Sequence, residues 1–323
     1  MKIYSYFHYS YSLFTTSKGF PVASYKIIFL QLVTFGLIFC KFSQAQELEP
    51  RSYINIPVDQ NFIALVYVYS EGDINTSPDV PIENLTLRND GPIMAYVRTF
   101  AMFDHSAKID ISVGHACALG KAKFNGTNVS RGFCGITDTR VRLNYNFYGA
   151  PALDLQNYVT HKKEIVIGTS FQVNIPTGEY DTQYIFNIGS NRWYVKPEIG
   201  MSIPVNNWEI DFSLGVKIFS ENNEFQRTST LRQDPIYNFQ THLIYDITRS
   251  QWLALDLNYF EGGDTYLNGK NTSQTRGNYR SGLTYSYAFN SHHSIKLLAN
   301  TGVTTRLGND SKAYGVGWSY RWQ

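Results

Sequence analysis

The sequence predicts an all-β fold: a transmembrane, antiparallel, up-and-down β-barrel of about 12 strands. Three observations carry this prediction. Runs of about 10 to 12 residues alternate between apolar and polar side chains, the connections between them are alternately short and long, and aromatic residues gather near the ends of the runs. A tilted strand that spans a bilayer needs about 9–11 residues, whereas strands in soluble proteins average about 5–6.

The composition excludes several classes of protein. The chain has 323 residues, of which 43% are hydrophobic, 17% charged and 15% aromatic. The 28 basic and 26 acidic residues nearly balance, which argues against a nucleic-acid partner because phosphate binding needs an excess of positive charge. No apolar run reaches the roughly 18–20 residues of a spanning helix, and the mean hydropathy is −0.26.

Residues 1–45 are typical of a signal peptide. The apolar stretch 27–40 follows Lys18 and Lys26, and small residues occupy the two positions that a cut after Ala45 requires. We therefore predict export and cleavage after Ala45. A buried N-terminal helix is the alternative.

The mature chain then divides into a periplasmic N-terminal segment, 46–59, and a barrel, 60–323. Two cysteines remain in it, Cys117 and Cys134. Because an exported chain passes through an oxidising compartment, the pair is a candidate disulfide. Two free thiols are the alternative, and the spacing alone does not decide between them.

The alternation is clearest in four runs: 137–147, 164–175, 208–219 and 313–322. In each, one face is apolar or aromatic and the other is polar, charged or glycine, as expected for a strand between lipid and a polar lumen. A soluble antiparallel sheet with one wet face is the alternative. The predicted strands are 60–71, 92–103, 107–118, 136–147, 164–175, 193–204, 208–219, 236–247, 252–262, 278–289, 294–305 and 313–322.

The connections predict the orientation of the barrel. Short turns alternate with longer loops, as in outer-membrane barrels with turns in the periplasm and loops outside. An even number of strands places both termini in the periplasm. One inner connection, 148–163, is long, and we expect a short helix at 152–158. The short turns are 104–106, 205–207, 248–251 and 290–293; the longer loops are 72–91, 119–135, 176–192, 220–235, 263–277 and 306–312.

The polar face carries charges of both signs, which predicts a lumen with weak charge selectivity. These charges line a conduit in one interpretation. In the other, they form a salt-bridged plug that closes a narrow barrel. The candidate lumen-lining residues are Asp138, Arg140, Arg142, Lys196, Glu198, Glu209, Asp211, Lys217, Asp256, Arg280, Lys296 and Arg321.

Aromatic residues mark both membrane interfaces. Trp208 and Trp322 fall near short-turn ends, while Trp193 and Tyr314 fall near long-loop ends. We expect outer-membrane lipid around this belt. The aromatic final strand, ending on Trp322 before Gln323, is similar to the signal that barrel assembly machinery reads.

The sequence carries almost no motif of a catalytic or metal-binding site. GxSxG, P-loop, CxxC and HExxH motifs are absent from the sequence. The His292–His293 pair lies in a predicted turn, where solvation is the simpler interpretation than metal binding. We therefore expect no catalytic residue, no metal site and no cofactor, and the chain is not predicted to be an enzyme.

Several segments together resemble one known family. They are LEPRSYINIPVDQNF (48–62), NFYGAPALDL (146–155), FQVNIPTGEYD (171–181), NIGSNRW with KPEIG (187–200), and stretches of 292–322 that end in GVGWSYRW. They are similar to the outer-membrane transporters named for the meta-cleavage pathway of phenol degradation. The resemblance implies a barrel in a bacterial outer membrane and a part in moving small molecules. It assigns no residue-level site.

Two functions are compatible with this sequence. The first is passive passage of small solutes, hydrophobic or aromatic ones among them, through a polar lumen. The second is a largely closed structural or surface-interaction barrel that acts through its extracellular loops.

Overall fold

The computed structural model describes residues 49–75, 82–124, 127–184, 187–271, 276–304 and 308–323. The predicted signal peptide and its cleavage site at Ala45 lie outside the described residues. Among those residues, no helix is both long enough and apolar enough to cross a membrane.

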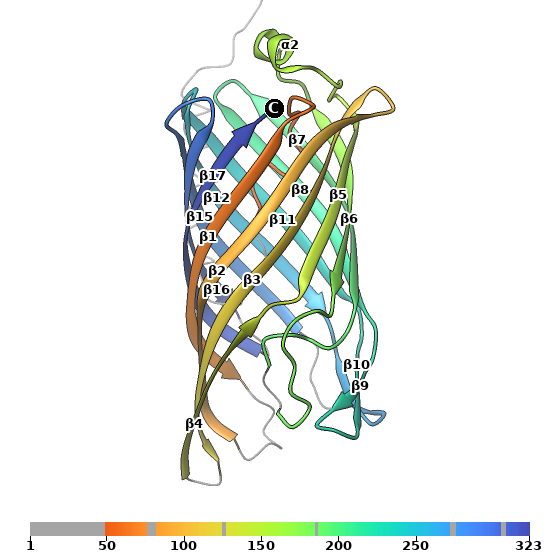
Figure 1. Ribbon diagram of the computed structural model, residues 1–323, viewed down its shortest axis with the longest axis vertical. Coiled ribbons are helices and arrows are strands. Elements are labelled where there is room, and N and C mark those ends of the chain that lie inside the picture. The colour runs from red at the N-terminus through yellow and green to blue at the C-terminus, as the bar shows by residue number, and fades with distance from the viewer. Residues whose placement is uncertain (1–48, 76–81, 125–126, 185–186, 272–275, 305–307) are drawn as a thin grey trace, which may run out of the picture. The chain divides into compact units, whose positions relative to one another are not determined.

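Twelve antiparallel strands close a barrel, which confirms the predicted fold class (Figure 1). Each strand pairs with the next one around the wall, and the last pairs with the first through a ladder from Asn61↔Trp322 to Asn75↔Gly308. In order, the strands are β1 (Asn61–Asn75), β2 (Ile82–Met102), β3 (His105–Phe124), β5 (Thr139–Tyr148), β6 (Val166–Ile175), β7 (Tyr194–Val205), β8 (Trp208–Phe219), β11 (Ile236–Thr248), β12 (Gln251–Gly262), β15 (Arg276–Ala288), β16 (His293–Thr304) and β17 (Gly308–Trp322).

The main difference from the prediction lies at the long-loop end, at the bottom of Figure 1. Strands β2 and β3 have 21 and 20 residues, and β4 (Thr127–Ile136) pairs with the outer half of β3. Much of 72–91 and 119–135, predicted as loop, is therefore strand. Outside the bilayer a strand needs no apolar face, so its side chains no longer alternate between apolar and polar. Its backbone can still form hydrogen bonds with the neighbouring strand, so the strand continues.

Two further elements lie in the connections. The connections 220–235 and 263–277 hold a small sheet of β9 (Asn222–Phe225), β10 (Ser229–Gln233), β13 (Thr265–Leu267) and β14 (Lys270–Asn271). The long inner connection holds α2 (Leu155–Thr160), capped by the Asp154 side chain, which accepts from the backbone N–H of Asn157. This helix begins three residues after the predicted start at 152. It lies with the short turns at the top of Figure 1.

The outer face of the wall is an apolar belt. Leu65, Met94, Leu214 and Leu283 each expose more than half of their surface. Aromatic contacts flank the belt at the short-turn end, where the Trp208 and Tyr245 ring centroids are 4.7 Å apart. Exposed apolar area on this scale is stable only against lipid or another apolar surface.

Candidate functional site: the two sides of the lumen

An N-terminal segment, Glu49–Gln60, lies along part of the inner wall. It precedes β1, and its Asp59 N–H donates to the carbonyl of Thr99 near the short-turn end of β2, 3.0 Å away. The sequence placed 46–59 outside the barrel as a periplasmic segment, whereas its described residues contact lumen-facing side chains. We call Glu49–Gln60 the plug segment.

Arg51 fixes the plug segment to the wall near the short-turn end. Its Nε lies 3.2 Å from Glu209 Oε1 on β8, and its Nη2 lies 2.5 Å from Asp246 Oδ1 on β11. Its backbone N–H donates to Asp211 Oδ2 at 2.7 Å. Lys163 adds a second cation, 2.7 Å from Asp246 Oδ2. Three carboxylates therefore converge on one arginine of the plug segment.

Glu49 forms the inner end of the plug segment. Its carboxylate is ion-paired with the Nη1 group of Arg142 on β5, and Arg140 Nη2 lies 3.9 Å away. Burial alone would raise the pKa of Glu49, but the Arg142 and Arg140 guanidinium groups outweigh that effect and hold it well below its usual range. Glu49 is therefore a carboxylate at neutral pH.

Tyr53 fills a gap in the wall that two glycines leave open. A Cβ on Gly200 would lie 2.1 Å from Tyr53 Cε2, and one on Gly168 would lie 2.9 Å from Tyr53 Cδ1. The Tyr53 hydroxyl donates to Glu198 Oε1 at 2.9 Å and lies 3.1 Å from Ser170 Oγ. Burial and the Glu198 charge raise the pKa of Tyr53, which stays neutral.

The other predicted charges on this side are also engaged. Lys196 Nζ lies 2.7 Å from Glu198 Oε2. Asp256 Oδ1 lies 2.7 Å from His242 Nδ1, and its Oδ2 accepts from the Thr284 hydroxyl at 2.7 Å. Asp138 lies between β4 and β5 and accepts hydrogen bonds from the backbone N–H groups of Gly178 and Ser190, so it anchors the loop 176–192. Lys217, the last of the predicted charged residues on this side, has its ammonium group over the Tyr194 ring.

The opposite side of the lumen has a different character. The inward faces of β16, β17, β1 and β2 carry small and apolar side chains such as Val66, Val68, Ala95 and Leu298, and these are only half-buried. A Cβ on Gly317 would lie 3.1 Å from Val66 Cγ2, so both residues share the inner face. Side chains of the plugged side, such as Gln172 at 1% exposure, are buried. Solvent therefore reaches the inner wall on the β16–β2 side.

Three predicted lumen residues belong to this second region: Arg280 on β15, Lys296 on β16 and Arg321 on β17. Among the described side chains, they are the charged groups on the inward faces of β15, β16, β17, β1 and β2, and none of them pairs with a carboxylate. We call these five strands the open side, of which β15 is the border strand with buried inward side chains such as Arg280 and Thr284. The plugged side is formed by β3, β5, β6, β7, β8, β11 and β12. The twelve predicted residues thus share one lumen but form two groups.

Sequence reasoning missed three residues that organise the lumen: Arg51, Tyr53 and Trp252. Arg51 and Tyr53 lie in a segment without periodicity, so no face could be assigned to them. Trp252 faces inward, with Arg51 Cζ 5.1 Å and Lys296 Nζ 5.7 Å from its ring centroid. The sequence did contain a signal for Trp252: it lies four residues before Asp256 in β12, and side chains an even number of residues apart share one face of a strand. Within the described part of the chain, no group of three or more His, Cys, Asp or Glu side chains could hold a metal ion.

A cavity of about 800 Å³ lies at the short-turn end. Arg51, Tyr158, Lys163 and Asp246 contribute to its lining, so it joins the plug segment to the connection that carries α2. The Tyr158 hydroxyl donates to the carbonyl of Asn55 at 3.1 Å. The plug segment is therefore held at its outer end as well as in the lumen.

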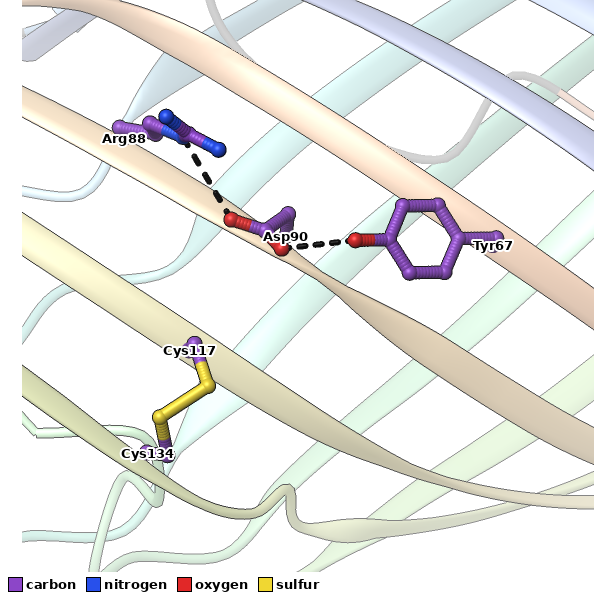
Figure 2. The surroundings of a disulfide bond; sticks show 5 residues. All are labelled: Tyr67, Arg88, Asp90, Cys117 and Cys134. Atoms are coloured by element: carbon purple, nitrogen blue, oxygen red, sulfur yellow. Dashed lines mark hydrogen bonds and ion pairs between the residues drawn. A yellow bond between two sulfur atoms is a disulfide. The ribbon is translucent and has the colours of Figure 1, made fainter.

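Cys117 and Cys134 are joined by a disulfide and face each other directly in the β3–β4 ladder (Figure 2). Next to them on β2, Asp90 accepts from the Tyr67 hydroxyl at 2.7 Å and lies 3.5 Å from Arg88 Nε. The disulfide lies on the outer surface, where β3 leaves the barrel wall, and therefore stabilises the hairpin rather than the lumen.

A family described as "Putative MetA-pathway of phenol degradation" matches residues 113–322. No curated protein matches the sequence. The fold is similar to the COG4313 outer membrane channel from Pseudomonas putida F1, with 16% identity, a TM-score of 0.71, and coverage of 85% of this chain and 100% of that one. It is also similar to the beta domain of the Bordetella autotransporter Brka, with 11% identity, a TM-score of 0.55 and coverage of 82% and 100%.

Proposed function

Since the chain belongs to the MetA-pathway family of phenol degradation, we propose that it is a channel for passive passage of small solutes, hydrophobic or aromatic ones among them. The barrel is a protein of the bacterial outer membrane, because its wall is closed and the apolar belt on its outer face is suited to contact lipid. We propose that the short turns and both termini of the mature chain lie in the periplasm and that the long loops face the outside of the cell. The aromatic strand β17 is the segment that assembly machinery would recognise.

The observation that carries the proposal is the half-buried, apolar inner face of the open side. Inward side chains of a closed structural barrel should fill the lumen and be buried, as they are on the plugged side. Val66, Val68, Ala95 and Leu298 instead keep accessible apolar surface. Such a surface costs free energy against water and favours a solute with an apolar body. We propose no catalytic activity for this channel.

Proteoliposomes test this proposal with a pair of substitutions in neighbouring strands. Val66→Trp adds bulk to the open side of the lumen, whereas Val316→Trp adds the same bulk to the outer face, where Val316 is 49% exposed. We expect the first change to reduce the flux of a small neutral aromatic solute severalfold and the second to leave it unchanged. Both variants should keep the heat-dependent mobility in SDS that reports a folded barrel.

The plug segment favours the second function, a largely closed barrel, because Tyr53 is buried in the lumen and hydrogen-bonded to the wall there. The same experiment separates the two proposals. Flux through the unmodified protein that does not exceed that of empty vesicles would contradict transport and favour a role for the extracellular loops.

A further inference from the structure

We infer that the channel selects for solutes that carry a negative charge, and that Lys296 is the lumen group that binds this charge. The inference rests on the proposed passage along the open side and adds a substrate class to it: small organic anions with an apolar body, such as aromatic carboxylates.

The acidic residues that face the lumen are already engaged on the plugged side. Asp110 accepts from Arg142 Nε at 2.9 Å, and Glu198 pairs with Lys196. Glu209 pairs with Arg51, and Asp256 binds His242 and Thr284. A carboxylate held in this way attracts a passing cation weakly, because its field is largely cancelled at a distance.

The cations of the open side have no such partners. Lys296 makes no ion pair or hydrogen bond through its ammonium group with any described residue, and its side chain is exposed. Arg280 is fully buried, donates through Nη2 to Asn300 Oδ1, and has no described partner for Nε and Nη1. Arg321, near the short-turn end, is half-buried. The described charges on the inward faces of the open-side strands are therefore all positive, and Lys296, on which the Glu49 and Asp256 carboxylates act only from beyond ion-pair distance, is the exposed one.

Lys296 is the accessible member of this group and has suitable neighbours for an amphipathic anion. Its partners across the two ladders are Ser286 and Gly317, and Leu298 lies two residues along the same inner face. Its ammonium group is 5.7 Å from the Trp252 ring centroid. An ammonium group at the edge of an apolar surface can bind a carboxylate while the apolar body of the solute contacts Leu298 and Val66.

Arg280 and Arg321 extend the positive potential toward both openings. Arg280 lies near the long-loop end of β15, opposite Asn258, whose side-chain amide also has no partner among the described residues. Arg321 is paired with Phe62 near the beginning of β1. An anion that enters from the short-turn end therefore passes the half-buried Arg321 before it reaches Lys296, while the buried Arg280 adds positive charge within the wall toward the long-loop end.

The test compares benzoate with benzamide, a neutral molecule of nearly the same size and shape, in proteoliposomes. We expect the intact protein to pass benzoate faster, and Lys296→Gln to reduce the benzoate rate about tenfold, the effect of losing one charge-assisted interaction. Lys296→Arg should restore it, and Lys217→Gln, a lysine of the plugged side, is the matched control. Lys296→Glu should shift the reversal potential in a salt gradient toward cation selectivity.

The outcomes distinguish the two proposals. Equal rates for benzoate and benzamide, or a benzoate rate that Lys296→Gln leaves unchanged, would refute the anion site while transport stands. Absence of flux for both solutes would refute transport. Binding can then be read separately, because benzoate bound at Lys296 should quench Trp252 fluorescence, with Trp252→Phe as the control. Quenching that persists in Lys296→Gln would overturn the assignment to Lys296.

Discussion

The two sides of the lumen solve the problem of a polar interior in different ways. On the plugged side, buried charges are paired with each other and with Arg51, Glu49 and Tyr53 of the plug segment. On the open side, the inward faces of β16, β17, β1 and β2 carry small and apolar side chains, and its cations form no ion pair with a carboxylate among the described residues. The comparison shows that a count of charges does not predict selectivity. The accessibility and pairing of each charge decide it.

The largest effect should come from releasing the plug segment. Arg51→Glu replaces the cation that holds Glu209 and Asp246 with a fourth carboxylate in the same cluster. Removing one partner from a buried pair costs about 3–5 kcal/mol, and a like charge adds repulsion. We expect single-channel conductance in planar bilayers to rise severalfold.

The control for this prediction is Arg88→Glu, which breaks an exposed pair with Asp90 on the outer face of β2, away from the plug segment. It should leave conductance unchanged. Conductance of Arg51→Glu equal to that of the unmodified channel would mean that the plug segment does not limit the plugged side.

A smaller effect is expected from Gly200→Val. Its side chain would occupy the position of the Tyr53 ring, since even a Cβ would lie 2.1 Å from Tyr53 Cε2. The ring must move, and the hydrogen bond to Glu198 is lost with it. We expect increased protease sensitivity of the plug segment and a modest rise in conductance.

Tyr53→Ala removes the other partner of the contact between the Tyr53 ring and Gly200. It should reproduce the protease sensitivity, and in combination with Gly200→Val it should add little. Additive effects of the two changes would show that the ring and the glycine do not form one contact.

The effect of pH on conductance should be smaller still, and its direction follows from the titration of Glu49. Its pKa is lowered in the folded protein, so its contribution to docking the plug segment is fully present above the ordinary carboxyl pKa of about 4.3 and is lost as the pH falls through the lowered value. Titration of Glu49 itself should therefore add no change in conductance between neutral pH and about 4, and should raise conductance only in stronger acid.

Glu49→Gln serves as the control, because it removes the titrating group and keeps the shape. Its conductance should be higher at neutral pH and should not rise further through this step. An acid step of unchanged size in Glu49→Gln would assign the titration to another group.

The smallest effect on the barrel should come from the disulfide. Its two cysteines are 17 residues apart, so reduction removes a constraint of about 3 kcal/mol in the chain-entropy estimate, but only for the β3–β4 hairpin. Paired Cys117→Ser and Cys134→Ser should increase proteolysis of the hairpin while flux and heat-dependent mobility stay unchanged. A loss of flux would show that the hairpin acts on the lumen.

Alternation predicted the barrel and the direction of its side chains because lipid and lumen impose a period of two on each strand. It placed Arg142 and Asp211 on the inner face. It could not predict that Asp110 and Glu49 neutralise Arg142, because contacts of this kind depend on which strands become neighbours and on a segment without regular structure. The position of Arg51 was beyond reach for the same reason. The outer halves of β2 and β3 were missed because polar strands lack a hydrophobic signal.

The difference between the two sides can be measured directly by cysteine accessibility in membranes. Val66→Cys faces the open side, and Ser170→Cys faces the plugged side beside Tyr53. Cys117 and Cys134 are already bonded to each other. A small, anionic, water-soluble thiol reagent should label Val66→Cys rapidly and Ser170→Cys at least about tenfold more slowly, unless Arg51→Glu is also present. Equal labelling of both positions in the otherwise unmodified barrel would contradict a lumen with one open and one plugged side.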